Sequence, residues 1–429
     1  NVTGDNDDEE DIKGSRLSCR HLYEPIAMIS CLQRTHAAPA WDASFCVSRF
    51  AWLVVVFAIV FPTEEPAIAQ NRAPDEVFER AEKLEETGVD THFGPSCVDR
   101  LFDPFKCFDA RMEAVGGPTF LGLYAPMWQV GTQRGSNDNM ISQSVNLYGE
   151  WELLHNPGQE GTLYTFYLHE SESLGTTAGQ FSDAVGTTIL PNDDVGDAVN
   201  ALAHIAWTQK MFDGLLEISA GQLALKVFID QNDYAGWDRV SCASGPLSGN
   251  QVRNFPIAAL GVDTTAHVTD NLQVSMVVAD ADGYPFYPDV KSFGRRFVYI
   301  PGFVYTPEIC GLGKGRYEVN FSHIERTERF GGAGRSSSVW LFSFQQELSP
   351  ALAAFLRFGT GDGRRTAVQQ SLATGIVFTQ FLGYNNDWLG LGLIWQDPSD
   401  GTRRDDYGME MFWRLQLTEN IQLTADEIG

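Results

Sequence analysis

The stretch "YGMEMFWRLQL", Tyr407 to Leu417, decides the fold class of this chain. Its alternate residues are large and apolar, namely Tyr407, Met409, Met411, Trp413, Leu415 and Leu417. The residues between them are small or polar, except for Phe412. A two-residue repeat puts the two kinds of side chain on opposite faces of a β-strand. The turn "TEN" follows, and a new alternation begins at Ile421.

The same alternation recurs along most of the chain, for example in "SVNLYGEWELL" (144–154), "NLQVSMVV" (271–278) and "RYEVNFSH" (316–323). We count about fifteen such segments after residue 117, each of roughly 8–12 residues, the length that a tilted membrane strand needs. Their connections alternate between short and long, as in outer-membrane barrels. A soluble β-sandwich also alternates, but about 300 residues of antiparallel strands is large for one domain. The pattern therefore favours an all-β, transmembrane antiparallel barrel.

The composition limits the possible functions. The 30 Lys and Arg residues face 56 Asp and Glu residues, giving a net charge of −26. A nucleic-acid-binding protein must offset phosphate charge with Lys and Arg, so this class is excluded. The hydrophobic fraction of 43% is too high for a disordered chain. Aromatic residues make up 12% and many lie near the ends of predicted strands, as in the girdles of membrane barrels.

The N-terminal part contains one long apolar run, "AWLVVVFAIVF" (51–61). It is too short for a membrane-spanning helix, which needs about 20 residues. Arg49 precedes it and the small-residue site "AIA" follows before Gln70, so we predict a signal peptide over 49–69; a buried helix or strand is the alternative. We expect residues 1–48 to be an N-terminal extension, with Met28 as one possible start. Residues 70–117 would form a periplasmic segment with helices at 73–88 and 108–117, and 118–429 the barrel.

The cysteines show no metal-binding spacing, so we expect neither a metal nor a cofactor. Cys97 and Cys107 lie close enough in sequence to form a disulfide in an exported protein, and two free thiols are the alternative. Cys242 falls in a long loop on the outer or lumenal side, and Cys310 in a connection on the periplasmic side. A bond between Cys242 and Cys310 would contradict the predicted topology.

Five stretches in order carry a resemblance to a known family: "FDARMEAVGGPTFLGLY", "GEWELLHNPGQEGTLYTFYLH", "LLEISAGQLALKVFIDQNDYAG", "IAALGVDTTAHVTDNLQVSMVVADADG" and "YGMEMFWRLQLTENIQLTADEIG". Over roughly residues 108–429 the chain resembles the carbohydrate-selective porins of the OprB type. The resemblance implies a sixteen-stranded barrel that lets sugars diffuse passively across the outer membrane of a Gram-negative bacterium, without catalysis. Because the family continues through one more strand, we expect part of the fifteenth strand and the sixteenth to be missing here.

Candidate pore-lining residues follow from the alternation. The inward positions would be Glu150, Glu152, Glu217, Arg316, Glu318, Arg357, Glu410 and Arg414. The resemblance implies that the stretch "LLEISAGQLALKVFIDQNDYAG" runs into a constriction loop. Gln222 and Asp230 lie on the segment that enters this loop, and Tyr234 and Trp237 on the loop would offer rings for stacking on sugars. Each charge has the alternative role of a solvated wall residue with no part in selectivity.

The expected partners are sugars or small neutral solutes, outer-membrane lipid and lipopolysaccharide, and the barrel-assembly machinery, in a monomer or homotrimer. Two other functions compete with the channel. His169 and Ser171 stand two residues apart, as in some outer-membrane phospholipases, so a hydrolase is one alternative. A non-conducting surface barrel is the other. No GxSxG, HExxH or phosphate-binding loop accompanies them, and we predict that the chain is not an enzyme.

Overall fold

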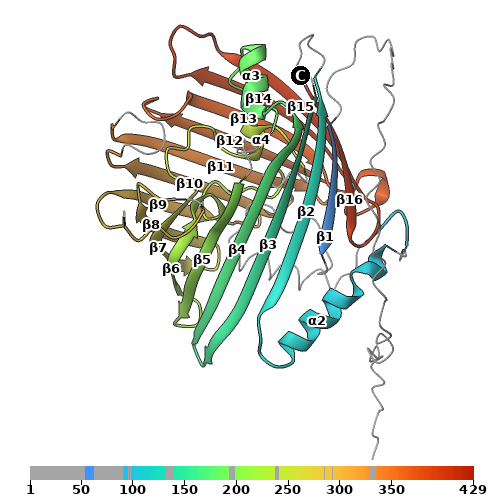
Figure 1. Ribbon diagram of the computed structural model, residues 1–429, viewed down its shortest axis with the longest axis vertical. Helices are drawn as coiled ribbons and strands as arrows, with labels where there is room; N and C mark the ends of the chain where they lie inside the picture. Colours follow the sequence, from blue (N-terminus) through green and yellow to red (C-terminus); the bar gives the residue numbers. More distant parts are fainter. Residues whose placement is uncertain are drawn as a thin grey trace, which may run out of the picture. The chain divides into compact units, whose positions relative to one another are not determined.

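The structure, a computed structural model, describes residues 54–61 (backbone only), 90–94, 96, 98–131, 139–192, 199–236, 241–284, 286–291, 293–327 and 334–429. Figure 1 shows a β-barrel with a few short helices. The strands are β1 Val54–Phe61, β2 Thr119–Val130, β3 Asn139–Asn156, β4 Gln159–Gly175, β5 Val199–Met211, β6 Leu216–Ala224, β7 Ala258–Thr269, β8 Leu272–Asp280, β9 Phe297–Tyr305, β10 Gly315–Ile324, β11 Ser337–Ser349, β12 Leu352–Gly361, β13 Val368–Phe378, β14 Trp388–Pro398, β15 Asp406–Gln416 and β16 Ile421–Ile428. The helices are α2 Asp103–Glu113, α3 Ala178–Val185 and α4 Gly245–Ser248, with 3-10 turns η2 Asp99–Leu101, η3 Leu225–Val227 and η4 Phe381–Gly383.

The strands form one closed antiparallel barrel in which each strand from β2 onward pairs with the next one in sequence. Closure pairs the backbone N–H and C=O groups of every strand with a neighbour on both sides. The predicted fold class is confirmed, and the roughly fifteen alternating segments expected after residue 117 correspond to β2 to β16.

Strand β1 occupies the place between β2 and β16. Val54 pairs with Asp426 of β16, and Phe61 pairs with Gly122 of β2. The sequence analysis assigned this run to a signal peptide, with a buried helix or strand as the alternative. It also expected part of the fifteenth strand after residue 117, which is β16, and the whole strand beside it to be missing. In the structure the run fills that place. The removal of residues 49–69 as a signal peptide stays a prediction.

The alternation in β15 has the predicted orientation. Tyr407, Met409 and Met411 are exposed on the outer face of the barrel, whereas Glu410 and Arg414 are buried on the inner face. Phe412, which broke the sequence pattern, also points inward and is 2% exposed. Its ring occupies the space in which a side chain at Gly390 of the neighbouring strand would lie, so the glycine makes room for it.

The two ends of the barrel differ as expected. The end at which β3 meets β4 and β15 meets β16 carries the short connections between consecutive strands, and we call it the short-turn end. The long connections that follow β4, β6 and β8 start at the opposite end, which we call the long-loop end. Helix α3 lies in the connection after β4. Thr177 and Gln180 form a capping box at its start, and Gly186 ends it in the left-handed conformation.

Helix α2 is displaced from its prediction. We expected a helix over 108–117, but the structure has it over Asp103–Glu113. Pro104 stands in the first turn, where its missing N–H costs no hydrogen bond, and the sequence analysis overlooked this start signal. The second predicted helix, 73–88, lies outside the described residues. Cys97 does so too, and therefore its disulfide with Cys107 stays a prediction.

The segment before α2 is fastened to the short-turn end. The backbone N–H groups of His92 and Phe93 donate to the carbonyls of Gln416 and Leu417, and His92 Nε2 lies 2.6 Å from Asp387 Oδ2. We call the described residues 90–102 the N-terminal latch. This latch joins a segment early in the chain to the last turn of the barrel.

Asp99 holds the latch on the turn between β15 and β16. Its Oδ1 accepts hydrogen bonds from Thr418 Oγ1 at 2.7 Å and Asn420 Nδ2 at 2.9 Å, and its Oδ2 accepts from Ser96. Burial raises the pKa of Asp99, but these hydrogen bonds outweigh it and lower the pKa to about 2. The carboxylate is therefore ionised at neutral pH.

Candidate functional site inside the barrel

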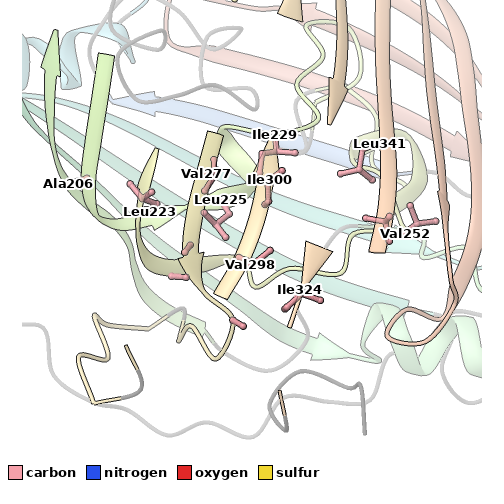
Figure 2. Packing of buried hydrophobic residues seen from close by; sticks show 14 of the residues in the cluster. Ala206, Leu223, Leu225, Ile229, Val252, Val277, Val298, Ile300, Ile324 and Leu341 are labelled. Carbon is pink, nitrogen blue, oxygen red and sulfur yellow. The ribbon is translucent and has the colours of Figure 1, made fainter. Parts of the chain in front are cut away.

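The connection between β6 and β7 folds into the barrel, and we call its described residues, 225–236 and 241–257, the inward loop. Most of the inward loop is buried, and its other described side chains are partly buried. Leu225, Ile229 and Val252 pack against inward-facing side chains such as Ile300 and Leu341 (Figure 2). The sequence analysis predicted a constriction loop here from the family resemblance. The structure shows that apolar packing holds one side of this loop against the inner wall.

A buried ion pair fixes the corner of the inward loop. Arg357 Nε of β12 lies 3.3 Å from Asp230 Oδ1, and both side chains are almost fully buried. Arg357 also donates to the carbonyl oxygens of Asp230, Ala235 and Leu247. Asp230 has a φ of +65°, which Asp tolerates better than most residues. One arginine of the wall thus binds three separate points of the loop.

The side chain of Glu318 on β10 binds the backbone of the same corner of the loop. Its two carboxylate oxygens accept from the N–H groups of Asp230 at 2.7 Å and Gln231 at 3.2 Å. Asn320 Nδ2 donates to Glu318 Oε1 at 2.6 Å, and Arg316 Nη2 lies 3.4 Å from Glu318 Oε2. A carboxylate that accepts several N–H donors is stabilised in its buried position.

Three further strands bind later residues of the loop. On β11, Gln345 Oε1 accepts from the N–H of Asp233 at 2.6 Å. On β15, Glu410 accepts from the N–H of Ala243 at 2.5 Å and of Ser244 at 3.0 Å. Asp426 of β16 also accepts from Ala243 at 3.2 Å. The inward loop is thus hydrogen-bonded along the wall from β10 to β16.

An aromatic and cationic group lies beside the loop. The guanidinium carbon of Arg414 stands 3.5 Å from the ring centroid of Trp388, and this ring lies 5.8 Å from that of Tyr234. Such a stack is stabilised by the attraction of the cation to the ring face. Trp237, the second predicted stacking ring, lies outside the described residues.

Of the remaining predicted residues, Glu150, Glu217 and Arg316 are partly exposed. Arg316 also reaches the inward loop, because its Nη2 donates to Gln231 Oε1 at 2.9 Å. Glu152 is exposed at the end of β3, where its Oε1 lies 2.6 Å from His155 Nδ1. Gln222 is buried and donates to the carbonyl of Tyr284 in the loop after β8, at 2.8 Å. The predicted residues thus divide into a set that binds the inward loop, to which Arg316 belongs, and a set that does not.

Several residues of the loop interface were missed by the sequence analysis. Asn250 donates its N–H to Asp230 Oδ2 at 2.6 Å, and its side chain donates to the carbonyl of Phe358. Asn254 and Ser322 are joined at 2.8 Å. Ser322 and Asp426 could have been found, because each is a polar residue at an alternate position of a strand. Nothing in the sequence pairs an asparagine of the loop with its partner on the wall.

The thiols and the candidate hydrolase residues were also located. Cys242 is buried in the inward loop and Cys310 is exposed at the short-turn end, and no disulfide joins them, as the predicted topology requires. His169 Nδ1 lies 2.9 Å from Asn200 Oδ1, whereas the side chain of Ser171 lies outside the described part. Within the described ranges, no helix has the length and apolar composition to cross a bilayer, and no group of three or more metal-ligating side chains gathers.

Comparison with known proteins agrees with the family resemblance. Residues 312–428 match the family described as carbohydrate-selective porin, OprB family. The matched region runs from the start of β10 to the end of β16 and includes Glu318, Arg357, Glu410 and Arg414. The resemblance drawn from the sequence is confirmed, and the matched family is one of channels rather than enzymes, as predicted. No curated protein sequence matches the chain.

A solved structure shows the same fold. The high-pH structure of Pseudomonas putida OprB matches with a TM-score of 0.58 and 15% sequence identity, covering 75% of this chain and 96% of that one. A mutant of the Rhodopseudomonas blastica porin matches with a TM-score of 0.44 and 9% identity, covering 73% of this chain and all of that one. The likeness in fold rests on the first of these.

Proposed function

From the match to the carbohydrate-selective porins, we propose that this protein is an outer-membrane channel through which sugars and other small neutral solutes diffuse passively. One observation carries the proposal: a loop is fixed inside a closed barrel by buried charges of the strands that match the family. Such a loop narrows the passage inside the barrel. Fixed hydrogen-bonding groups along a narrow passage can select solutes. The short-turn end would face the periplasm and the long-loop end the exterior.

The two sets of predicted residues would have different roles in this channel. Glu318, Arg357 and Glu410 would set the width of the passage, because they hold the inward loop to the wall. Glu150 and Glu217 would face water and solute, and Arg316 would do so at the edge of the inward loop, where it donates to Gln231. Charges of both signs would orient water and sugar hydroxyls. The Tyr234, Trp388 and Arg414 group would contribute apolar ring surface near the loop.

The proposal includes the surroundings of the protein. The exposed apolar side chains of the outer face, such as Trp128, Phe303 and Trp413, suit contact with lipid, and lipopolysaccharide would cover the long-loop end. Insertion would require the barrel-assembly machinery. Export and assembly as a monomer or homotrimer belong to the same proposal. Removal of a signal peptide over 49–69 would take β1 with it, so the closed barrel requires that Val54–Phe61 stays in the chain.

The test is single-channel conductance of the refolded full chain in a planar lipid bilayer, with and without millimolar glucose. We expect steady conductance that glucose lowers, because a sugar held in the narrow passage excludes ions. A folded, membrane-inserted barrel that conducts nothing would overturn the proposal and favour the non-conducting surface protein. Conductance that no sugar changes would keep the channel but remove carbohydrate as its substrate.

A further inference from the structure

Helix α2 and its flanks carry an apolar stripe that faces away from the protein. Leu101, Phe105, Phe108, Met112 and Val115 follow a spacing of three and four residues, which places them on one side of a helix. Four of them are strongly exposed: Leu101 by 68%, Phe105 by 53%, Phe108 by 49% and Val115 by 77%. A helix on the surface of a water-soluble protein turns such a stripe toward the core.

A neighbouring side of the helix attaches it to the barrel. Lys106 Nζ lies 3.9 Å from Glu419 Oε2 in the turn between β15 and β16. Asp109 Oδ1 accepts the N–H of Phe120 at 3.1 Å. Phe102, just before the helix, is 5% exposed. These contacts leave most of the apolar stripe exposed, whereas a helix that packs on a soluble core buries its stripe.

The stripe continues into the outer apolar face of the barrel. The ring of Phe108 stacks with that of Phe120 at a centroid distance of 6.5 Å, and Phe120 of β2 is itself 47% exposed on the outer face. Trp151 of β3 donates its indole N–H to the carbonyl of Gly116, just after α2. Figure 1 shows α2 beside the lower end of β2, at the short-turn end.

We propose that α2 lies in the inner, periplasmic leaflet of the outer membrane and inserts Leu101, Phe105, Phe108 and Val115 among phospholipids at the boundary of headgroups and acyl chains. This inference rests on the proposed outer-membrane location. Helices of this kind lie in the plane of the membrane with their apolar side buried. The stripe meets the lipid-facing surface of the barrel at Phe120, so one continuous apolar surface would face the same leaflet.

The size of the stripe favours lipid over a second copy of the chain. Four side chains exposed by about half to three-quarters present roughly 400 Å². Stable protein interfaces bury about 800 Å² on each partner. An interface with a second copy through this stripe alone would bury well below that area. Insertion of apolar side chains into a lipid leaflet requires no minimum contact area.

Photo-crosslinking in phospholipid nanodiscs tests the inference. The variants Phe105→p-benzoylphenylalanine and Phe108→p-benzoylphenylalanine place a photoreactive ring on the stripe. Phe303, on the outer face of β9, serves as the control in the lipid belt, and Val290, 73% exposed in the loop after β8, as the control in water. We expect positions 105 and 108 to give lipid adducts within about twofold of position 303 and at least fivefold above position 290.

Three other outcomes contradict the inference. Lipid adducts at 303 without adducts at 105 and 108 would place α2 in water while leaving the barrel in the membrane. A covalent dimer at 105 or 108 would assign the stripe to a second copy. Absence of lipid adducts at 303 as well would mean that the barrel itself is not in lipid, in which case the proposed function fails together with this inference.

Discussion

Replacing Arg357 by Met should release the inward loop. The substitution keeps an apolar side chain of similar length but removes the charge that pairs with Asp230 and the donors to the carbonyls of Ala235 and Leu247. Removing one partner of a buried pair typically costs about 3–5 kcal/mol, because the other charge stays buried without compensation. About 4 kcal/mol corresponds to a roughly thousandfold increase in the ratio of detached to attached loop.

The assay is single-channel recording in planar bilayers, supported by hydrogen exchange of the loop amides. Arg357→Met should give a larger and noisier conductance than the natural protein, a weaker response to glucose, and faster exchange in residues 230–236. The matched control is Arg364→Met. Arg364 is 53% exposed and its Nε lies 3.7 Å from Asp362 Oδ2. An exposed pair of this kind contributes at most about 1 kcal/mol, so we expect no change in conductance.

A double-mutant cycle separates the ion pair from the other bonds of Arg357. Asp230→Asn removes the charge and keeps a residue that tolerates the positive φ. The two substitutions combined should cost less than the sum of their separate effects by about 1 kcal/mol or more. Additive effects, or an Arg357→Met channel with natural conductance and natural loop exchange, would refute the view that this pair holds the loop.

Three further predictions concern the helical segment, the latch and the aromatic group. Burial raises the pKa of Asp109 to about 6, because the opposing effect of the Phe120 N–H is smaller and the Glu113 carboxylate raises the pKa further. The folded protein therefore favours the protonated form of Asp109. Docking of α2 should be strongest below about pH 4 and weaken as the pH rises through 6. The free energy of docking should change by roughly 1 kcal/mol between pH 4.5 and 7.5 after allowing for solvent screening, as measured by hydrogen exchange of α2. Asp109→Asn should abolish this pH dependence. The pKa of Asp99, lowered to about 2, has the opposite consequence: its contribution to the latch is complete above about pH 4 and lost as the pH falls through 2. Asp99→Asn should therefore weaken the latch by about 1–2 kcal/mol at pH 7, seen as faster proteolysis of residues 90–102, and equal rates in the two proteins would contradict this. Trp388→Leu removes the ring under Arg414 and should reduce block by glucose more than it changes conductance in its absence, whereas unaltered block would exclude the ring from the sugar pathway.

The sequence by itself determined the barrel and the direction of most of its side chains. A strand has a repeat of two residues, so Met409 and Glu410 had to face opposite sides wherever β15 lay in the molecule. Short and long connections in turn assigned the two ends. Inward positions such as Glu318 and Arg357 could be named for the same reason, since a residue's face depends only on its neighbours in the strand.

Only the tertiary structure decided what those inward residues bind. Arg357 meets Asp230 across 127 positions of sequence, and Glu410 meets Ala243 across 167. Such contacts depend on how a loop without a repeat folds inside the barrel. The sequence likewise could not predict that the apolar side of α2 is exposed, because an amphipathic helix has the same pattern whether its apolar side meets protein or lipid. Periodicity fixes the face of a residue, whereas its partner is fixed by packing between segments that the sequence does not place together.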